Sequence, residues 1–167
     1  MLSEKQQAMV NLWEDHVRYE FEDHDVDSTL TTMTDYPHII NIPTMAGGKG
    51  VDGVREFYKH SFLHNMPDDM TSILISRTVG DHQIVDETIL KFTHTVEMPW
   101  ILPGIEPTHK KVEVPLVAIV AFKYGSINHE HIYWDQGTVL VQLGLIDSES
   151  LPVEGSDSSQ HLENISQ

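Results

Sequence analysis

Residues 110–135 read KKVEVPLVAIVAFKYGSINHEHIYWD, and this stretch decides the fold. Apolar and β-branched residues dominate from Lys110 to Lys123, and Tyr124-Gly125-Ser126 supplies the small and flexible residues of a tight turn. From Ile127 to Asp135 the side chains alternate between two faces of an extended chain. The stretch therefore predicts a long antiparallel hairpin near the end of the folded chain.

The same period of two extends toward the N-terminus. Ile73, Ile75 and Val79 alternate before a turn at Gly80-Asp81. On the next predicted strand one apolar face is formed by Leu90, Phe92, His94, Val96 and Met98. The apolar loop Pro99–Gly104 then interrupts the sheet, so we expect it either to close over a ligand or to bury in a contact between subunits.

Helical patterns occupy the first part of the chain. Ser3 and Gln6 have the spacing of a capping box, after which apolar residues recur every four positions at Met9, Trp13, Val17 and Phe21. Further predicted elements are a short helix over 28–33, a short edge strand over 38–42, a flexible glycine loop over 47–50 and a helix over 52–66. Helices followed by long strands favour an α+β fold, in which a curved sheet and the N-terminal helices enclose a cone-shaped pocket.

The composition excludes several kinds of site and makes several partners improbable. The chain has 167 residues, a net charge of −16 and no cysteine, which excludes disulfides, a thiolate nucleophile and a cysteine zinc site. The acidic charge makes nucleic acid and anionic membranes poor partners. The apolar runs are too short to span a bilayer and Met1–Ser28 is acidic, so we expect a soluble, cytoplasmic protein.

We expect one domain over residues 1–146, followed by a disordered tail over 147–167. The tail is rich in serine and acidic residues and contains no Lys or Arg. Its few large apolar groups would not offset the entropy lost on ordering.

Motifs at both ends of the domain resemble a known family. Gly125-Ser126-Ile127, the strand-end Asp135 and Gln142-Leu143-Gly144 are similar to the closing segment of the SnoaL-like polyketide cyclases, in the nuclear transport factor two-like superfamily. The segment Pro43–Gly50 before a helix with Val54 and Tyr58 is also similar to that group. The resemblance implies a cone-shaped, cystatin-like α+β barrel, often a homodimer through the sheet, with no cofactor.

The resemblance further implies that Asp135 is the acid/base residue, although Ser126 replaces the family's usual lysine. Burial in an apolar cone would raise the pKa of such a carboxyl toward the working pH. The alternative is a purely structural role, in which Asp135 caps the first turn of the final segment. Candidate donors for a developing enolate oxygen are His131, Tyr133 or His94, although a histidine on an apolar face, such as His94, is more often a satisfied core residue.

The remaining candidates line the pocket in this prediction. His129 shares its strand face with His131, and Trp100, Tyr36, Trp13 and Tyr58 could close over a flat hydrophobic ligand, although Trp13 and Tyr58 also fit plain core positions. His129 and His131 could bind a metal together with His94 or Asp135, but hydrogen-bonded histidines explain the pair more simply, so we predict no metal. The glycine segment Gly47–Gly50 lacks the spacing of a phosphate-binding loop.

The leading hypothesis is therefore a cofactor-free isomerase, cyclase or dehydratase acting on a hydrophobic carbonyl or polyketide-like substrate. The alternative is a small-molecule binding or dimerisation module without catalysis. The two hypotheses differ in one requirement. An enzyme needs buried titratable groups, whereas a binding module needs only a cavity of the right shape.

Overall fold

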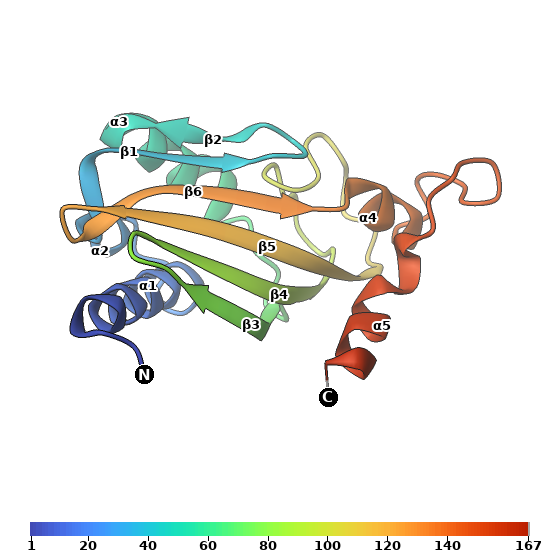
Figure 1. Cartoon of the computed structure of the whole chain (residues 1–167). Coiled ribbons are helices and arrows are strands. Elements are labelled where there is room, and N and C mark those ends of the chain that lie inside the picture. Colours follow the sequence, from blue (N-terminus) through green and yellow to red (C-terminus); the bar gives the residue numbers. More distant parts are fainter. Residues whose placement is uncertain (167) are drawn as a thin grey trace.

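The protein folds around one curved, open sheet. The computed structural model describes residues 1–166, with strand order β2-β1-β6-β5-β4-β3 (Figure 1). β1 runs parallel to β6, and the other neighbouring strands are antiparallel. The strands are β1 (Met33–Asn41), β2 (Ala46–Lys49), β3 (Thr71–Val79), β4 (Gln83–Thr93), β5 (Lys111–Lys123) and β6 (Ser126–Trp134).

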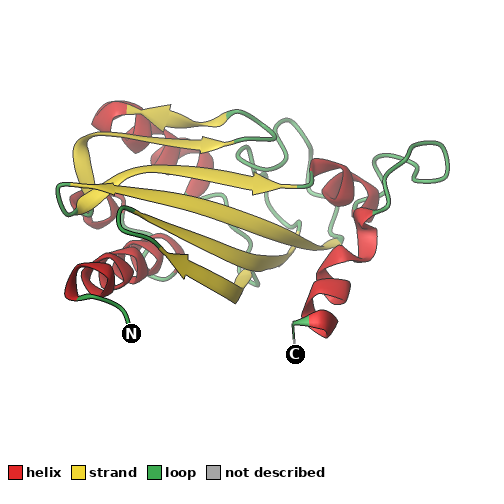
Figure 2. Ribbon diagram, viewed as in Figure 1, coloured by secondary structure: helices red, strands yellow, loops and turns green. Residues whose placement is uncertain are grey.

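Helices flank this single layer of strands (Figure 2). They are α1 (Glu4–Phe21), α2 (Val26–Thr31), α3 (Gly50–Phe57), the π-helical turn η1 (Tyr58–Phe62), α4 (Gln136–Gln142), the 3₁₀ turn η2 (Gly155–Asp157) and α5 (Ser158–Ile165). We call the side of the sheet that faces α1 the inner face and the opposite side the outer face. The predicted α+β class with a curved mixed sheet is confirmed.

The predicted hairpin is β5 and β6. Lys123 pairs with Ser126, and the two residues between them have positive φ angles of 55° at Tyr124 and 83° at Gly125. Two successive residues with positive φ are the requirement of the tight turn whose twist matches antiparallel strands. This turn fixes which side chains of the two strands share a face.

Three strands differ from the prediction in their position or length. The residues expected to form a short edge strand belong to the nine-residue β1, which lies between β2 and β6. The predicted glycine loop instead forms β2, which takes the edge of the sheet. β4 ends at Thr93, so His94 belongs to the connection that leads to β5.

The capping box of α1 is present. Ser3 Oγ accepts a hydrogen bond from the Gln6 N–H at 3.2 Å, and Gln6 Oε1 accepts from the Ser3 N–H at 2.9 Å. The buried stripe of the helix differs from the prediction, because it consists of Met9, Val10, Trp13, His16 and Glu20. A histidine and a glutamate therefore occupy core positions of α1.

The apolar loop after β4 packs inside the chain itself. Trp100, Ile101 and Leu102 are at most 2% exposed. The N–H groups of Ile101 and Leu102 both donate to the Met98 carbonyl, which folds the loop into a compact turn. These apolar side chains are therefore buried within the chain itself, and no contact with a second subunit is needed to cover them.

The C-terminal segment also differs from the prediction, because η2 and α5 are helical. Lys91 Nζ on β4 lies 2.7 Å from Glu163 Oε1, and Ser159 is 2% exposed. The side-chain amide of Gln142 donates to the Ser156 carbonyl at 2.7 Å. These contacts dock the segment on the domain, and Gln167, the last residue of the predicted tail, lies outside the described residues.

Among residues 1–166, no helix combines the length and the apolar character needed to cross a membrane.

Candidate functional site

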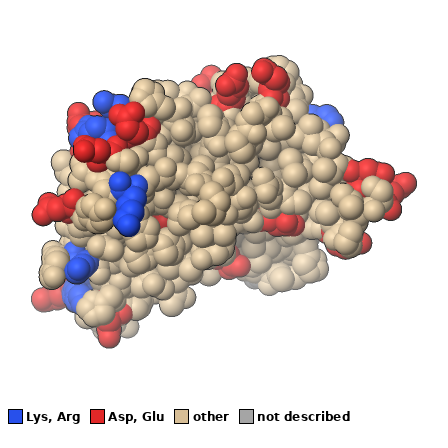
Figure 3. Space-filling view, turned by 90° about the horizontal axis from the view of Figure 1, so that it is seen from above, with Lys and Arg blue, Asp and Glu red and all other residues tan. Residues whose placement is uncertain are grey.

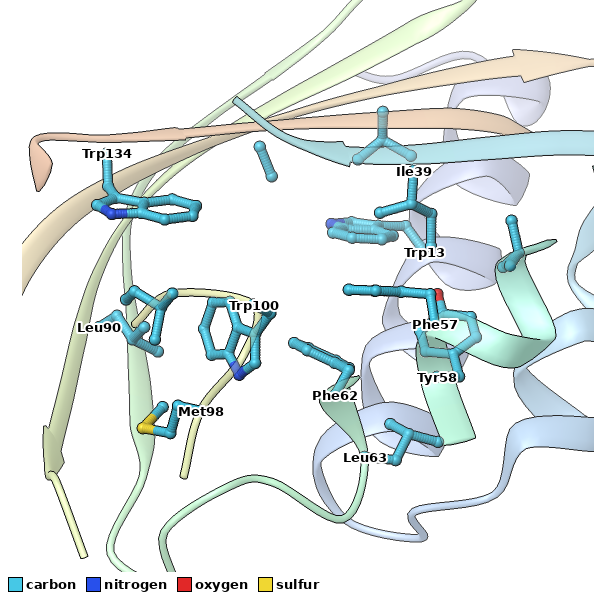
Figure 4. Packing of buried hydrophobic residues seen from close by; sticks show 14 of the residues in the cluster. Trp13, Ile39, Phe57, Tyr58, Phe62, Leu63, Leu90, Met98, Trp100 and Trp134 are labelled. Carbon is cyan, nitrogen blue, oxygen red and sulfur yellow. The ribbon is translucent and has the colours of Figure 1, made fainter. Parts of the chain in front are cut away.

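A cavity of about 450 Å³ lies between the inner face of the sheet and the helices. Aromatic side chains from separate elements surround it, with Trp13 and Phe57 facing Trp100 and Leu90 (Figure 4). This volume falls within the range of about 300–1,000 Å³ that is typical of small-molecule sites. The polar part of the lining includes Glu20, Asn41, Arg77, Asp86 and Glu130.

Asp86 is held firmly on one wall of the cavity. Arg77 donates to both of its carboxylate oxygens, at 2.7 and 2.9 Å, and Trp13 Nε1 donates to Oδ2 at 2.8 Å. Three hydrogen bonds, two of them from the charged guanidinium, therefore occupy the carboxylate oxygens. Asp86 orients Arg77 and Trp13.

A second polar cluster joins α1 to β6 at the cavity. His16 Nε2 lies 3.1 Å from Glu130 Oε1, 3.2 Å from Glu20 Oε1 and 3.1 Å from the Tyr58 hydroxyl. His16 is fully buried, and the two carboxylates are 2% and 4% exposed. We call these four residues the His16 cluster.

Hydrogen bonding fixes the protonation of His16. The Thr32 hydroxyl donates to the Thr29 carbonyl at 2.6 Å, so it accepts from His16 Nδ1, also at 2.6 Å. Nε2 faces two carboxyl oxygens, which accept a hydrogen bond from it when the carboxyl groups are ionised. With both carboxylates ionised, both ring nitrogens carry a proton and His16 is an imidazolium.

The electrostatics of the cluster agree with this assignment. Burial by itself would lower the pKa of His16, but the charges of Glu130 and Glu20 raise it to about 10. Burial raises the pKa of Glu130, with the His16 charge opposing the rise and Glu20 adding to it. Burial and the two carboxylates also raise the pKa of Tyr58, which keeps its hydroxyl neutral. One cation thus faces two carboxyl groups, and Glu130 binds a proton more readily than an ordinary glutamate.

Neither a protein-family model nor a curated protein matches the sequence, but solved structures do match the fold. A structure described as a putative SnoaL-like polyketide cyclase from Jannaschia sp. CCS1 has a TM-score of 0.68 and 16% identity, over 88% of this chain and 99% of that chain. TsrD from Streptomyces laurentii has a TM-score of 0.67 and 16% identity, over 87% and 100%. The chain has the NTF2-like fold.

Other solved structures of similar fold carry different descriptions. SalBIII, described as an epoxide hydrolase/cyclase-like enzyme of pyran ring formation in salinomycin, has a TM-score of 0.59 and 14% identity, over 80% of this chain and 95% of its own. A protein from Catenulispora acidiphila with a ketosteroid isomerase-like fold reaches 0.60 and 10%, over 80% and 92%. At such identities the likeness establishes the fold, and function has to be argued from the site.

Of the predicted site residues, Trp13 and Trp100 line the cavity. They come from α1 and from the loop after β4, and Phe62 of η1 packs edge-on against Trp100 at a centroid distance of 5.1 Å. The aromatic wall anticipated from the sequence is thus partly assembled.

Asp135, the residue expected to act as acid/base, is exposed and caps α4. Its Oδ1 accepts from the Gly137 N–H at 3.0 Å, and its Oδ2 accepts from the Thr138 hydroxyl at 2.7 Å. It is not among the residues that line the cavity. The local demand of a helix N-terminus, rather than a ligand, explains its position.

Four further candidates lie on the outer face. His129, His131 and Tyr133 of β6 point away from α1, because the cavity is lined by the alternate residues Glu130 and Ile132. Tyr36 of β1 is 66% exposed. The predicted alternation of β6 is correct from His129 to Trp134, but an irregularity before His129 leaves Ile127 in the core instead of on the face of the histidines. The histidines point away from the cavity because Glu130 is paired with His16.

His94 and Tyr58 are buried outside the cavity lining. His94 Nδ1 accepts from the Thr108 N–H at 3.2 Å, and burial lowers the pKa of its imidazole, as does the charge of His109. Tyr58 belongs to the His16 cluster through its hydroxyl. Both therefore occupy the core positions that the sequence left open for them.

The sequence contains a signal for the His16 cluster that apolar periodicity alone does not show. Met9, Trp13, His16 and Glu20 are separated by four, three and four residues, which places them on one helical face. A charged histidine on a buried helix face requires a negatively charged partner. Glu130 of β6 is such a partner.

Proposed function

We propose that the protein is a small-molecule enzyme of the isomerase, cyclase or dehydratase type, with Glu130 as its general acid/base. The observation that carries the proposal is a 2% exposed carboxyl group at the edge of an apolar cavity, beside an imidazolium. The substrate class is a hydrophobic carbonyl compound, because the aromatic walls favour an apolar molecule and an adjacent carbonyl makes a C–H bond acidic enough to ionise.

Glu130 is favoured over the other carboxyl groups of the cavity. Asp86 already accepts three hydrogen bonds, and Glu20 accepts a hydrogen bond from Tyr58. Among the described residues, Glu130 Oε1 pairs with His16 Nε2 alone, at 3.1 Å. Glu130 therefore keeps more lone pairs for a substrate proton than Asp86 does.

The reaction needs a single proton-shuttling group. Glu130 removes the proton from the carbon next to the carbonyl, the electron pair moves into the carbonyl oxygen, and the resulting carboxylic acid returns the proton to another carbon or to a leaving oxygen. The His16 imidazolium stabilises the carboxylate form between turnovers. The Asn41 Oδ1, which is buried without a partner in the described chain, can accept a hydrogen bond from a substrate hydroxyl.

Exchange of substrate protons with heavy water tests this proposal without knowledge of the final product. A panel of hydrophobic ketones is incubated with the protein in D₂O, and loss of the α-proton signal is followed by NMR. We expect Glu130→Gln to lower the exchange rate of the responsive ketone by about 10²–10⁴-fold. Asp135→Asn is the matched control and should retain the wild-type rate.

The opposite pattern, with exchange lost in Asp135→Asn and retained in Glu130→Gln, would return the acid/base role to Asp135. If the wild-type protein binds ketones without accelerating exchange, the non-catalytic binding module is the correct reading.

The homodimer remains part of the proposal. Val117 and Ile119 of β5 are only half-buried, and Tyr133 beside them is 40% exposed, which leaves an apolar strip on the outer face. We expect light scattering to show a dimer at micromolar concentration and Ile119→Asp to shift it toward the monomer. A monomeric wild-type protein would remove this part of the proposal.

A further inference from the structure

Three histidines from two neighbouring strands converge on the outer face. They are His38 of β1 and His129 and His131 of β6, and their nearest ring nitrogens lie within 4.8 Å of one another. His38 Nε2 is 2.9 Å from His131 Nε2. The ring centroids are 4.3 Å apart for His129 and His131 and 4.8 Å apart for His38 and His129. We call this group the three-histidine cluster.

The sheet itself builds the cluster. β1 and β6 are parallel, and their register pairs His38 with His129 and Ile40 with His131. The register of β1 shifts between Met33 and His38, at the irregularity that contains Pro37, and this shift sets His38 opposite His129. Side chains on paired strands are held by the backbone ladder, so the three imidazoles are preorganised on rigid elements.

From this arrangement we propose that the three-histidine cluster binds a divalent transition-metal ion of the zinc type. Imidazole nitrogen is a preferred ligand of such ions, and three histidines supply three of the four positions of tetrahedral zinc. Water or a group that approaches the outer face takes the remaining position.

The distances are compatible with coordination. Two nitrogens bound to tetrahedral zinc lie about 3.3 Å apart, given Zn–N bonds of about 2.0–2.1 Å. The His38–His131 nitrogens need to separate by a few tenths of an ångström, and the His129 nitrogen needs to move inward. Because the three side chains are only half-buried, rotation of the rings accomplishes this without moving the strands.

The surroundings of the cluster also suit a cation. Burial lowers the pKa of His38 and of His129, which favours the uncharged imidazole that binds metal ions. The chain carries a net charge of −16, and acidic side chains are scattered over the surface in Figure 3, which attracts divalent cations to the protein.

This site is separate from the proposed acid/base chemistry. His129 and His131 lie on the opposite side of β6 from Glu130, so a metal at the cluster does not touch the cavity. The inference holds whether or not Glu130 is catalytic, and its test does not use enzymatic activity.

Zinc binding to the full chain, prepared without a histidine tag, tests the proposal. ZnCl₂ is titrated in competition with a colorimetric chelator, and the bound metal is counted by elemental analysis after dialysis. We expect one zinc per chain. Loss of an outer hydrogen-bond partner of a metal ligand typically costs 10–100-fold in affinity, so removal of a ligand in His129→Ala or His131→Ala should cost at least about 100-fold.

The matched control is His64→Ala, because His64 is exposed and distant in sequence from the cluster. We expect this variant to bind zinc as the wild type does. Glu20→Gln checks the other group of potential ligands, His16, Glu20 and Glu130, and should also leave zinc binding unchanged.

A measurement on the wild-type chain alone covers the case in which a variant fails to fold. Cobalt(II) replaces zinc, and the intense visible absorption of tetrahedral cobalt is expected on its addition. The proposal is overturned if the wild-type chain binds neither metal, or if binding persists when His129 and His131 are both replaced. Loss of binding in Glu20→Gln, with retention in His131→Ala, would move the metal to the buried group and would equally overturn it.

Discussion

The buried imidazolium predicts that the protein loses stability as the pH rises from 6.5 to 10. An unfolded histidine has a pKa near 6.5, whereas the carboxylates of Glu130 and Glu20, acting against the effect of burial, raise the pKa of folded His16 to about 10. The folded state thus binds a proton that the unfolded state has released. The stabilisation is fully present below pH 6.5 and disappears as the pH passes 10.

The size of the effect follows from the two pKa values. Each unit between them corresponds to about 1.36 kcal/mol, so the full interval is worth about 5 kcal/mol at most. Breaking a buried ion pair by removing one partner typically costs about 3–5 kcal/mol, which is consistent. A domain with a total stability of about 5–15 kcal/mol would lose a large part of it.

Urea unfolding at a series of pH values measures this dependence, and the tryptophans provide the signal. Trp13 stacks on the His16 ring at a centroid distance of 5.4 Å, so its fluorescence also reports the protonation state of that ring. The His16→Gln variant should be less stable at pH 6.5 and should have a much flatter dependence between pH 6.5 and 10. His64→Ala, which removes an exposed histidine, should keep the wild-type slope.

Equal slopes for the wild type and His16→Gln would refute the assignment. So would NMR spectra of the ring nitrogens in which His16 titrates near pH 6.5. Either result would mean that the cluster holds its protons on the carboxyl groups.

Three further changes test the packing of the described chain. Truncation after residue 148 removes α5 and its contact with Lys91, and it should lower the melting temperature by at least about 2–4 °C, whereas an unchanged value would mean that this helix adds no stability. Arg77→Met should cost about 3 kcal/mol in urea unfolding, because the buried Asp86 carboxylate keeps only its bond from Trp13, and a cost below 1 kcal/mol would contradict this. Gly48→Ala should destabilise the protein measurably, since an added Cβ would lie 2.1 Å from the backbone oxygen of Gly53. Gly125→Ala is the comparison variant, because φ is positive there but the space is open, so it measures the cost of backbone conformation alone.

The hairpin of β5 and β6 was predictable because its signals are local. Period-two alternation and a glycine turn determine two antiparallel strands from their own residues, and the capping box does the same for the start of α1. The α+β architecture follows from the order of such elements. These features depend on neighbours a few positions apart, which a single sequence displays.

The site was less predictable because alternation assigns residues to two faces without saying which face is inside. The histidines of β6 looked more suitable for a pocket than Glu130, yet the glutamate is internal because His16 of α1 pairs with it. That pairing depends on how a helix crosses the sheet. Asp135 shows the converse, since this strand-end carboxylate caps α4 and does not line the cavity.

The parallel pairing of β1 with β6 means that the sheet cannot be completed until β6, the last strand, has been synthesised. The two strands meet through residues 93 positions apart, as in the contact of His38 with His131. At synthesis rates of about 5–20 residues per second, roughly 5–20 s pass between the emergence of the two strands from the ribosome. During that interval the edge of β1 that β6 later occupies has no partner strand, and an unpaired edge can pair with other chains.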